Sequence, residues 1–506
     1  MFNSPVLSLC DLLGGQYVKA VAGAAAAAGA SFEDDVFDAV DFYPPEKQIH
    51  DDMFIKQVGR RIAPAFEASP GGAATDSFGR AFCAPAAPLT GFGCFRIGED
   101  GHLYLLGKSE HYHTPLGHRF GGYNLIDKAR RLGVVNPTHN NTRGYITRLA
   151  EIKLIQAANG LCQNDGAALE KTLNSREPKT LNRIVNLETG SLAVEAGVKM
   201  MLAKFFRLDK SFAEPEYFKK TPVFLVMADH NGAFEANYHG TTVLTQTFRG
   251  MWPEFYEKTA NAGLYKVAAV KINDIGDFRK KIHEYNKNGF KTAGFLHEII
   301  LMNYGAIRLT PEYLNAAYEL CRETDTPVLA DEIQSCMWYD GMFLFRQYGL
   351  NPDFLVIGKG FPGGEYPASK IITTAKMDTL NQFGALVTNG QEELASLSYL
   401  ITMAFVSANG GVISGLGGYF QNRLSEIGRK YPEIIKKTEG LGHLAALHFH
   451  SVKEAAKFAK KLNARYIDAS AQIYKQNCPP AVLLKPPVIS SEAVMDFIAD
   501  TIEENI

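Results

Sequence analysis

Two ionisable residues, Asp331 and Lys359, stand where two apolar segments of the sequence end. The segments read Val-Leu-Ala-Asp at 328–331 and Phe-Leu-Val-Ile-Gly-Lys at 354–359, and both are typical of buried β-strands. In an open parallel sheet the carboxyl ends of the strands border one crevice, so we expect both side chains to face the same ligand. An amine beside an acid suits an aldehyde cofactor whose ring nitrogen must stay protonated.

Pyridoxal phosphate is a cofactor of this kind, because it takes a Lys for its Schiff base and an acidic partner for its pyridinium nitrogen. Neither residue is specific by itself. A Lys after a strand is most often a solvated loop charge, and an Asp at a strand end is often the N-cap of a helix. The prediction of pyridoxal phosphate therefore depends on the residues that surround Asp331 and Lys359.

Two further segments supply groups that a phosphorylated pyridine ring would need. Thr189, Gly190 and Ser191 follow an apolar strand and open a helix, where free backbone N–H groups bind phosphate. The same three residues also make an ordinary helix N-cap. Tyr238, in Tyr-His-Gly at 238–240, follows the next strand, where its ring can lie on the face of the cofactor. A tyrosine of the core or surface is the alternative.

The elements that must position these residues follow an alternating β/α pattern. Short apolar segments rich in β-branched residues are separated by spacers of helix length, which indicates a mostly parallel sheet with helices on both faces. We expect seven strands in this sheet, at 184–187, 223–227, 267–271, 293–298, 327–331, 354–358 and 370–373. The predicted fold class is α/β, with the sheet in a large domain at 120–405.

A smaller α/β domain is expected to form from both ends of the chain. Residues 1–119 would supply an N-terminal segment and part of this domain, including a hairpin at 94–106, and residues 406–506 would supply the rest. The glycine-rich segment 410–418 is interpreted as a hinge or loop. The Ala-rich stretch 20–30 lacks the basic start of a targeting segment and is predicted to be a helix.

The composition argues against several classes of protein. The 506 residues are 46% hydrophobic and carry a formal charge of -2, so the chain can bury a large core but lacks the basic footprint of nucleic-acid binders. No stretch approaches the ~18 consecutive apolar residues of a membrane span. Seven cysteines are scattered without a CxxC pair, which favours a reducing compartment. We therefore expect a cytoplasmic protein with small-molecule partners and with neither nucleic acid nor membrane as a partner.

Five short motifs occur in a fixed order along the chain. They are Thr-Gly-Ser-Leu-Ala-Val-Glu-Ala at 189–196, Tyr-His-Gly at 238–240, His-Glu-Ile at 297–299, Asp-Glu-Ile-Gln at 331–334 and Ile-Gly-Lys-Gly-Phe-Pro-Gly-Gly at 357–364. In this order they resemble the class III aminotransferases, which are pyridoxal-phosphate enzymes of fold type I. The resemblance runs from about residue 95 to the C-terminus. The segment around Leu192 resembles the corresponding segment of the lysine 6-aminotransferase branch.

The resemblance implies roles at the reactive end of the cofactor. Lys359 would form the Schiff base and then move the proton between the substrate carbon and the cofactor. Asp331 would hold the ring nitrogen protonated. Glu298 would be an acid beside the site that orients its neighbours or pairs with a substrate-binding cation. These three residues are the predicted catalytic residues.

The resemblance also implies a set of cofactor-binding residues. Besides Asp331 and Lys359 the set consists of Gln334, Tyr238, Gly190, Ser191, Thr189 and Thr388. Gln334 would hydrogen-bond the phenolic oxygen and Tyr238 would stack on the ring. The phosphate would be bound by Gly190, Ser191 and Thr189. Thr388 aligns with a Thr that the family donates from the partner subunit to the phosphate, so the resemblance implies a homodimer with shared active sites.

The implied activity is the transfer of a terminal amino group from an amine or amino acid donor to a 2-oxo acid by ping-pong Schiff-base chemistry. The same fold and residues also serve racemases, aminomutases and decarboxylases, because the cofactor does the chemistry and the pocket chooses which bond breaks. A protein that binds the cofactor without turnover is a further alternative. The sequence leaves these alternatives open.

The chain departs from the family pattern near the substrate. The Pro of the family's Glu-Pro is Ile299, and the usual Gly-Phe-Gly-Arg-Thr-Gly becomes Cys-Met-Trp-Tyr-Asp-Gly at 336–341, so a family Arg is absent. Lys485 stands where the family commonly places an Arg that grips a substrate carboxylate. A Lys can act there as a point charge, but it cannot reproduce the bidentate geometry of a guanidinium.

One cluster has a spacing that could hold a metal. It reads Glu-His-Tyr-His at 110–113, with His118 nearby. We expect a hydrogen-bonded loop there and no metal.

Overall fold

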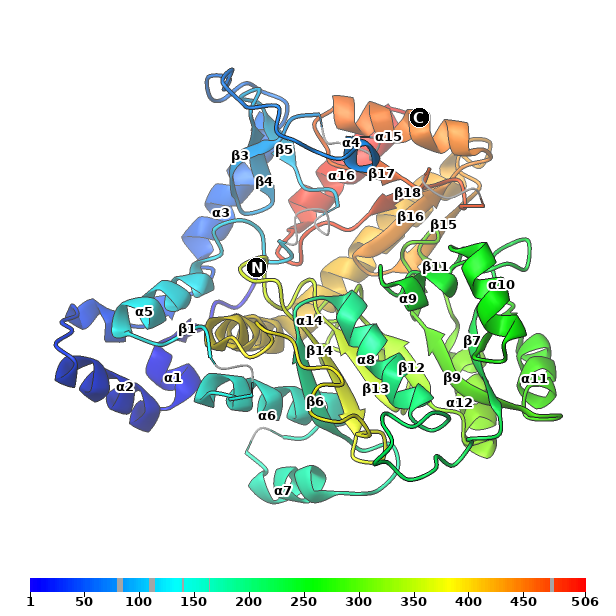
Figure 1. Ribbon diagram of the computed structural model, residues 1–506. Coiled ribbons are helices and arrows are strands. Elements are labelled where there is room, and N and C mark those ends of the chain that lie inside the picture. Colours follow the sequence, from blue (N-terminus) through cyan, green and yellow to red (C-terminus); the bar gives the residue numbers. More distant parts are fainter. Residues whose placement is uncertain (80–84, 109–113, 139–140, 163, 474–476) are drawn as a thin grey trace.

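A seven-stranded sheet forms the centre of the computed structural model, which describes residues 1–79, 85–108, 114–138, 141–162, 164–473 and 477–506 (Figure 1). Its strands are β6 (Leu181–Leu187), β7 (Thr221–Met227), β8 (Lys266–Val270), β9 (Phe290–His297), β12 (Val328–Asp331), β13 (Phe354–Ile357) and β14 (Ser369–Thr374). Their order is β6-β14-β13-β12-β9-β7-β8, and only β14 runs antiparallel to its neighbours. The prediction of a mostly parallel α/β sheet is confirmed.

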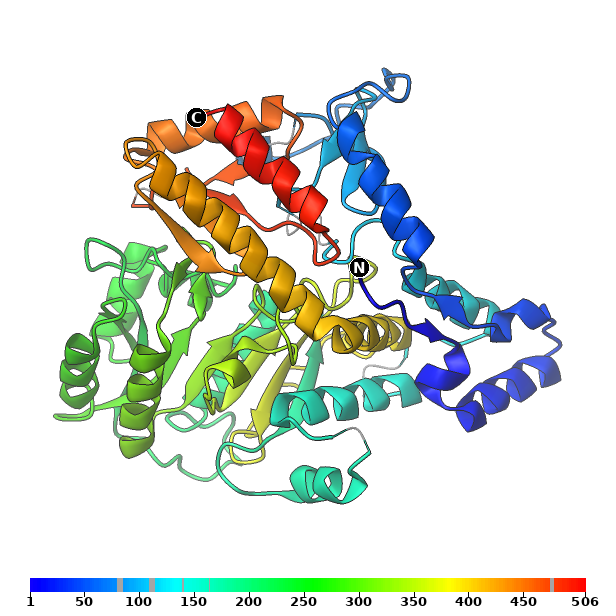
Figure 2. The same ribbon diagram turned by 180° about the vertical axis from the view of Figure 1, so that it is seen from behind.

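Helices cover both faces of this sheet because its strands are apolar on both sides. Along β13, Phe354 and Val356 belong to the core beneath α8 (Gly190–Leu202), whereas Leu355 and Ile357 belong to the core on the opposite face. The second core is covered by α6 (Tyr145–Asn159), α12 (Pro311–Glu323) and the first part of α14 (Glu393–Lys430); α6 and α14 are in view in Figure 2. Continuous burial on two faces explains why these strands have near-continuous apolar sequences.

A second sheet lies above the large one and carries the C-terminal part of the chain (Figure 1). It consists of β15 (Lys437–Leu441), β16 (Leu444–His448), β18 (Ala481–Leu484) and β17 (Ser470–Ala471), with α15 (Val452–Ala464) packed on it and α16 (Glu492–Glu504) packed on α14.

An N-terminal hairpin is joined to this second sheet. It is part of a three-stranded sheet of β3 (Pro88–Phe92), β4 (Phe95–Gly98) and β5 (Leu103–Leu105). The Leu105 N–H donates to the Tyr466 carbonyl at 2.8 Å. The buried Arg96 guanidinium holds both oxygens of Asp468 at 2.7 and 2.8 Å. Residues that are far apart in the sequence thus build one cap over the large sheet.

One helix corrects an expectation from the sequence. α14 continues without interruption through 410–418, where we predicted a hinge or loop, and through the predicted domain boundary at 405/406. The interpretation of the glycines as a break was wrong, because packing decides their position. A Cβ on Gly410 would lie 2.0 Å from Asp340 Oδ1, and one on Gly417 would lie 2.8 Å from the Gly442 Cα, so both glycines allow close approach of neighbouring segments.

By length and composition α14 could also cross a membrane. The sequence analysis did not predict this, because it found no long run of consecutive apolar residues. More than half of its most apolar window, 56%, is buried inside the protein. Its apolar side chains include Leu397, Ile401 and Phe405 in the main core. The hydropathy of α14 is therefore that of a central packing helix.

The first part of the chain lies beside α14 and α6 (Figure 1). α2 (Gly15–Ala27) covers most of the Ala-rich stretch 20–30 that we predicted to be a helix; α1 (Leu9–Leu13) precedes it, and α3 (Pro45–Met53) and α5 (Asn124–Leu132) follow. The remaining elements are β1 (Val6–Leu7), β2 (Val40–Asp41), α4 (Asp76–Gly79), α7 (Gly166–Asn174), α9 (Val243–Thr247), α10 (Pro253–Asn261), α11 (Ile275–Glu284), β10 (Ile300–Leu301), β11 (Ile307–Arg308), α13 (Leu344–Gln347) and three 3-10 turns at Asp34–Phe37, Ile55–Gln57 and Gly121–Tyr123.

Candidate active site

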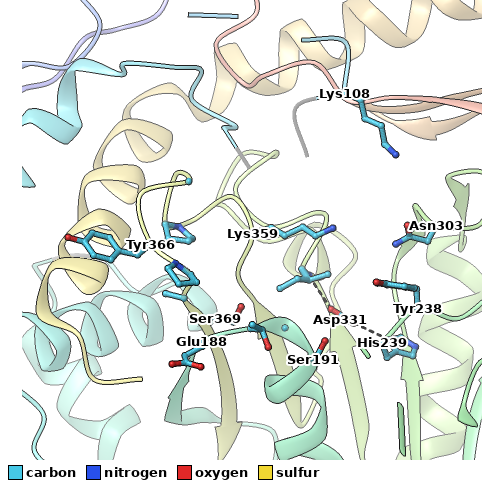
Figure 3. Close-up of a pocket in the computed structure, with 18 of the residues that line it drawn as sticks. Lys108, Glu188, Ser191, Tyr238, His239, Asn303, Asp331, Lys359, Tyr366 and Ser369 are labelled. Carbon is cyan, nitrogen blue, oxygen red and sulfur yellow. Dashed lines mark hydrogen bonds and ion pairs between the residues drawn. The ribbon is translucent and has the colours of Figure 1, made fainter. Parts of the chain in front are cut away.

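A cavity of about 900 Å³ opens at the carboxyl ends of the central strands. Asp331, the last residue of β12, pairs in register with Val356 of β13, and Lys359 follows β13 by two residues. Both side chains line the cavity, and Figure 3 shows Lys359 above Asp331, with Ser191 below and Tyr238 to the right. The chain topology thus brings together the acid and the amine from which the sequence analysis started.

Asp331 has a buried partner that the sequence analysis did not assign. His239 Nδ1 lies 3.0 Å from Asp331 Oδ2, and both side chains are almost fully buried. The other carboxylate oxygen, Oδ1, accepts the backbone N–H of Ile333 at 3.2 Å. His239 was quoted only as part of a motif, and its position directly after Tyr238 was the available signal. The two contacts fix the plane of the carboxylate at the cavity wall.

Lys359 occupies an unusual backbone position. Its φ is +39°, in the left-handed region that residues with a Cβ seldom adopt. Strain of this kind costs of order 1–3 kcal/mol and persists where the surroundings impose it. The preceding residue, Gly358, packs against Ser369 so closely that a Cβ on it would lie 2.2 Å from Ser369 Oγ. The turn therefore directs the amine into the cavity at the expense of local backbone strain.

The N-terminus of α8 forms a cradle in the floor of the cavity. Thr189, Gly190 and Ser191 all line it, and Thr189 Oγ1 caps the helix by accepting the Leu192 N–H at 3.4 Å. A Cβ on Gly190 would lie 2.8 Å from Ile333 Cδ1, so only glycine leaves the backbone accessible there. Backbone N–H groups and the helix dipole make this end of α8 suitable for a phosphate.

A second segment closes the same cradle. Ser191 Oγ accepts the N–H of Thr241 at 3.1 Å, and a Cβ on Gly240 would lie 2.7 Å from the Ser191 Cα. Gly240 has a φ of +130°, which glycine alone adopts without cost. The Tyr-His-Gly motif is thus locked onto the start of α8, and this contact places Tyr238 and His239 beside the cradle.

Three predicted site residues do not line the cavity. Gln334 and Glu298 are 2% and 1% exposed and lie beneath its wall, after β12 and β9 respectively. Thr388 is exposed to solvent in the segment before α14 and is not part of the cavity of its own chain. Its contact with the phosphate of a partner subunit stays a prediction.

Lys485 takes a different position from the family Arg that it replaces. It is 2% exposed, its Nζ lies 3.1 Å from Gln334 Oε1, and it lies 4.7 Å from the ring centre of Trp338. Lys485 is not among the residues that line the cavity. A role as the point charge for a substrate carboxylate is therefore not supported by its position.

Glu332, inside the Asp-Glu-Ile-Gln motif, holds the loop that contains Trp338. Its carboxylate accepts the backbone N–H groups of Leu344 at 3.0 Å and Phe345 at 2.6 Å and the Ser335 hydroxyl at 3.1 Å. Burial raises the pKa of Glu332 to about 7, although these three hydrogen bonds favour the ionised form. Adjacent acids of one motif thus serve different ends: Asp331 faces the cavity and Glu332 anchors a loop.

The predicted loop at 110–113 lies outside the described residues. Within the ranges that the structure describes, no group of three or more His, Cys, Asp or Glu side chains is arranged to hold a metal ion.

The sequence model of the family described as Aminotransferase class-III matches residues 121–506, which is most of the chain. This chain belongs to the class III aminotransferase family. Together with the parallel sheet and the cavity at its edge, this membership confirms the predicted family and fold type.

Individual members of the family show how far the likeness extends. The class III chain is 27% identical over 329 residues to a putrescine aminotransferase of Pectobacterium atrosepticum, covering 63% of this chain and 65% of that protein. It is 29% identical over 188 residues to the mitochondrial ornithine aminotransferase of Arabidopsis thaliana, covering 35% of this chain and 38% of that protein. The matched region is thus less than two thirds of the length of these relatives.

A solved structure of the family shows the same fold. The crystal structure of adenosylmethionine-8-amino-7-oxononanoate aminotransferase from Methanocaldococcus jannaschii has a TM-score of 0.65 and 18% identity to the class III chain. The comparison covers 91% of this chain and 99% of the other. At this level of identity the comparison shows a common fold and nothing about substrates.

Class III aminotransferases depend on pyridoxal phosphate, and the described residues fit this cofactor. The cradle at Gly190 and Ser191 suits its phosphate, Asp331 suits its ring nitrogen and Lys359 its aldehyde. Gln334 does not line the cavity, so its predicted hydrogen bond to the phenolic oxygen stays a prediction. The predicted cofactor is confirmed by the family and agrees with this donor set.

Proposed function

We propose that the protein is a pyridoxal-phosphate-dependent aminotransferase that moves a terminal amino group from an amine or amino acid to a 2-oxo acid. The observation that carries this proposal is the cavity in which Lys359, the Asp331–His239 pair and the α8 cradle meet. Membership of the class III family supports the reaction type. The relatives named as putrescine and ornithine aminotransferases support a terminal amine as the group transferred.

The protein's own residues would divide the work as follows. When bound, the cofactor supplies an electron sink for the bonds of the substrate carbon. The buried carboxylate of Asp331, held by His239 Nδ1 and the Ile333 N–H, keeps a proton at the ring nitrogen. The Lys359 amine takes a proton from the substrate carbon and returns it as a general acid–base.

The remaining groups bind and orient. The N–H groups at Gly190 and Ser191 would hold the phosphate, and Tyr238 would pack on the ring. Glu298, buried behind the wall, orients neighbouring groups. A site that holds the reacting atoms close together lowers the barrier of the reaction.

We also propose that the enzyme works as a cytoplasmic homodimer. Thr388 is exposed and does not reach its own cavity, which is compatible with donation to the phosphate site of a second subunit. The six cysteines in the described part of the chain are free, as suits a reducing compartment.

The absorption spectrum of the purified protein with pyridoxal phosphate tests this function. We expect a visible band that shifts when a terminal amine such as ornithine, lysine, putrescine or 4-aminobutyrate is added, and that returns with 2-oxoglutarate. Lys359→Ala should abolish the shift. Lys271→Ala, an exposed lysine directly after β8 of the same sheet, should leave it intact.

Other outcomes would identify the alternatives. A band that amines alter but 2-oxo acids do not restore would favour a racemase, aminomutase or decarboxylase. A band that no amine disturbs would favour a protein that binds the cofactor without turnover. The absence of any band would contradict the proposal outright.

A further inference from the structure

An arginine of the cavity wall places its guanidinium over the ring of the Tyr-His-Gly motif. Arg249 follows α9 by two residues and lines the same cavity as Lys359. Its Cζ lies 5.0 Å from the ring centre of Tyr238, which also lines the cavity and stands above His239 in Figure 3. The cation is attracted by the negative face of the ring. None of the motifs in the sequence points to Arg249.

The fold fixes the backbone from which this side chain extends. The preceding residue, Phe248, is fully buried and packs on Phe224 of β7 with the two ring centres 5.0 Å apart. The Arg249 N–H donates to the Gln246 carbonyl at 3.1 Å, and the chain then turns at Gly250, whose φ is +79°. The guanidinium therefore enters the cavity wall from a turn that is held on both sides.

The guanidinium has hydrogen-bonding capacity that the protein itself does not use. It carries a permanent charge and five N–H donors in a planar fork. Within the described part of the chain the half-buried Arg249 side chain makes neither a hydrogen bond nor an ion pair, and its contact is with the Tyr238 ring. Contact with a ring leaves the N–H groups available. A planar anion can accept two parallel hydrogen bonds from them.

Two kinds of anion would enter this cavity, the phosphate of the cofactor and a carboxylate of the substrate. The phosphate has its own cradle in the N–H groups at the start of α8. Arg249 lies instead against Tyr238, the residue that would pack on the cofactor ring, where the substrate reacts. Lys485 stands at the sequence position of the family's carboxylate-binding Arg but does not line the cavity. A substrate carboxylate is therefore the anion that fits Arg249.

We propose that Arg249 binds a carboxylate of the substrate. This inference rests on the proposed function and specifies its substrate class: amino acids and 2-oxo acids whose carboxylate accepts paired hydrogen bonds from the guanidinium. Diamines lack this group. The carboxylate subsite of this chain is thus supplied by the segment after α9, at a sequence position other than that of Lys485.

Binding of glutarate to the pyridoxal-phosphate-loaded protein tests the proposal without turnover, because this dicarboxylate has neither an amine nor a keto group. We expect Arg249→Met to raise the Kd of glutarate, measured by calorimetry, by at least about tenfold, since it removes charge-assisted hydrogen bonds. Arg249→Lys keeps the charge without the planar fork and should lie between the wild type and Arg249→Met.

Arg207 provides a matched control. Its guanidinium also lies over an aromatic ring, that of Phe218 at 5.9 Å, but the side chain is 42% exposed and does not line the cavity. Arg207→Met should therefore bind glutarate as tightly as the wild type. An equal loss of glutarate affinity in Arg207→Met and Arg249→Met would show that the effect does not come from the cavity and would overturn the proposal.

A matched pair of donors gives a second readout. 4-Aminobutyrate and putrescine have the same four-carbon chain, but only the first carries a carboxylate. The half-reaction with each donor, followed through the visible band without an acceptor, isolates the effect on the donor. Arg249→Met should lower the second-order rate constant for 4-aminobutyrate by at least about tenfold and leave that for putrescine nearly unchanged. Equal losses for both donors would show that Arg249 acts by holding Tyr238 and would overturn the proposal.

The binding results separate failure of this inference from failure of the proposed function. A raised Kd of pyridoxal phosphate in Arg249→Met, with glutarate affinity unchanged, would place Arg249 at the phosphate and overturn the inference. A wild type that transaminates putrescine but does not bind glutarate would also overturn it and would leave the proposed function standing. Loss of glutarate binding in Arg249→Met by a protein that does not transaminate would support the subsite and contradict the function.

Discussion

At the scale of single residues, two departures from the family pattern contact each other. Lys485 replaces an Arg and Trp338 belongs to the altered loop, and the Lys485 ammonium lies 4.7 Å from the Trp338 ring centre. The same ammonium lies 3.1 Å from Gln334 Oε1, whereas Gln334 Nε2 makes no hydrogen bond. Lys485 thus orients Gln334.

This contact predicts coupling between Lys485 and Gln334 in stability. Lys485→Met should lower the free energy of unfolding by about 1–3 kcal/mol, because it leaves Gln334 Oε1 buried without this donor. Adding Gln334→Leu should cost little more. Urea unfolding of the single and double variants would give a coupling energy of about 0.5–3 kcal/mol. Additivity within about 0.3–0.5 kcal/mol would contradict the arrangement.

At the scale of elements, neighbouring glycines of α14 differ in their surroundings. Gly410 faces Asp340, whereas a Cβ on the neighbouring Gly411 would meet no atom within 4 Å. Both lie inside the helix, where glycine is unfavourable relative to alanine. Glycine at 410 is required by packing, and glycine at 411 only weakens the helix.

Alanine substitutions at these neighbouring positions should therefore have opposite effects. Gly411→Ala should stabilise the protein by about 0.5–1 kcal/mol through helix propensity. Gly410→Ala should destabilise it by about 1–3 kcal/mol, because the new methyl group would overlap Asp340. Thermal unfolding of the two variants is the measurement. Stabilisation by both would show that Asp340 moves away freely.

At the scale of the whole molecule, buried histidines link stability to pH. Burial lowers the pKa of His297 in the large sheet to about 3, and that of His443 and of His448 in the small sheet to about 4. Each stays neutral in the folded protein at pH values where the unfolded chain, with a pKa of about 6.5, binds a proton. Stability from these groups is complete above about pH 6.5 and declines as the pH falls toward 4.

His448 allows this linkage to be measured for one group. Its Nε2 contacts the Gly305 carbonyl at 2.7 Å, and Gln can keep a donor there without titrating. Between pH 6 and 4.5, His448→Gln should reduce the slope of unfolding free energy against pH by about 1.4 kcal/mol per unit. Exposed His450→Gln should leave the slope unchanged. Equal slopes for wild type and His448→Gln would contradict the lowered pKa.

Glu332 acts in the opposite direction over part of the same range. Its raised pKa of about 7 means that the folded state binds a proton more tightly than the unfolded chain. Its contribution therefore declines as the pH rises from about 4.5 to 7. The pH dependence of the wild type is the sum of both effects, which is why the comparison with His448→Gln, at constant Glu332, is the informative measurement.

The sequence by itself determined the strands of the large sheet and two residues of its cavity, Asp331 and Lys359. Apolar runs with spacers of helix length predict the sheet, because burial on both faces leaves its mark within each run. Asp331 and Lys359 could be found because each directly follows such a run and the carboxyl ends of parallel strands share one edge. Each of these signals lies within a short stretch of sequence, so it can be recognised without the tertiary structure.

Only the tertiary structure decided which polar groups meet. His239 reaches Asp331 across 92 positions, Lys485 reaches Gln334 across 151, and Lys108 enters the cavity from the cap. It also decided that α14 continues through its glycines and that Lys359 adopts a strained φ of +39°. The physical reason is that such contacts depend on how distant elements pack, and a polar residue's sequence neighbours carry little information about partners that only packing brings near.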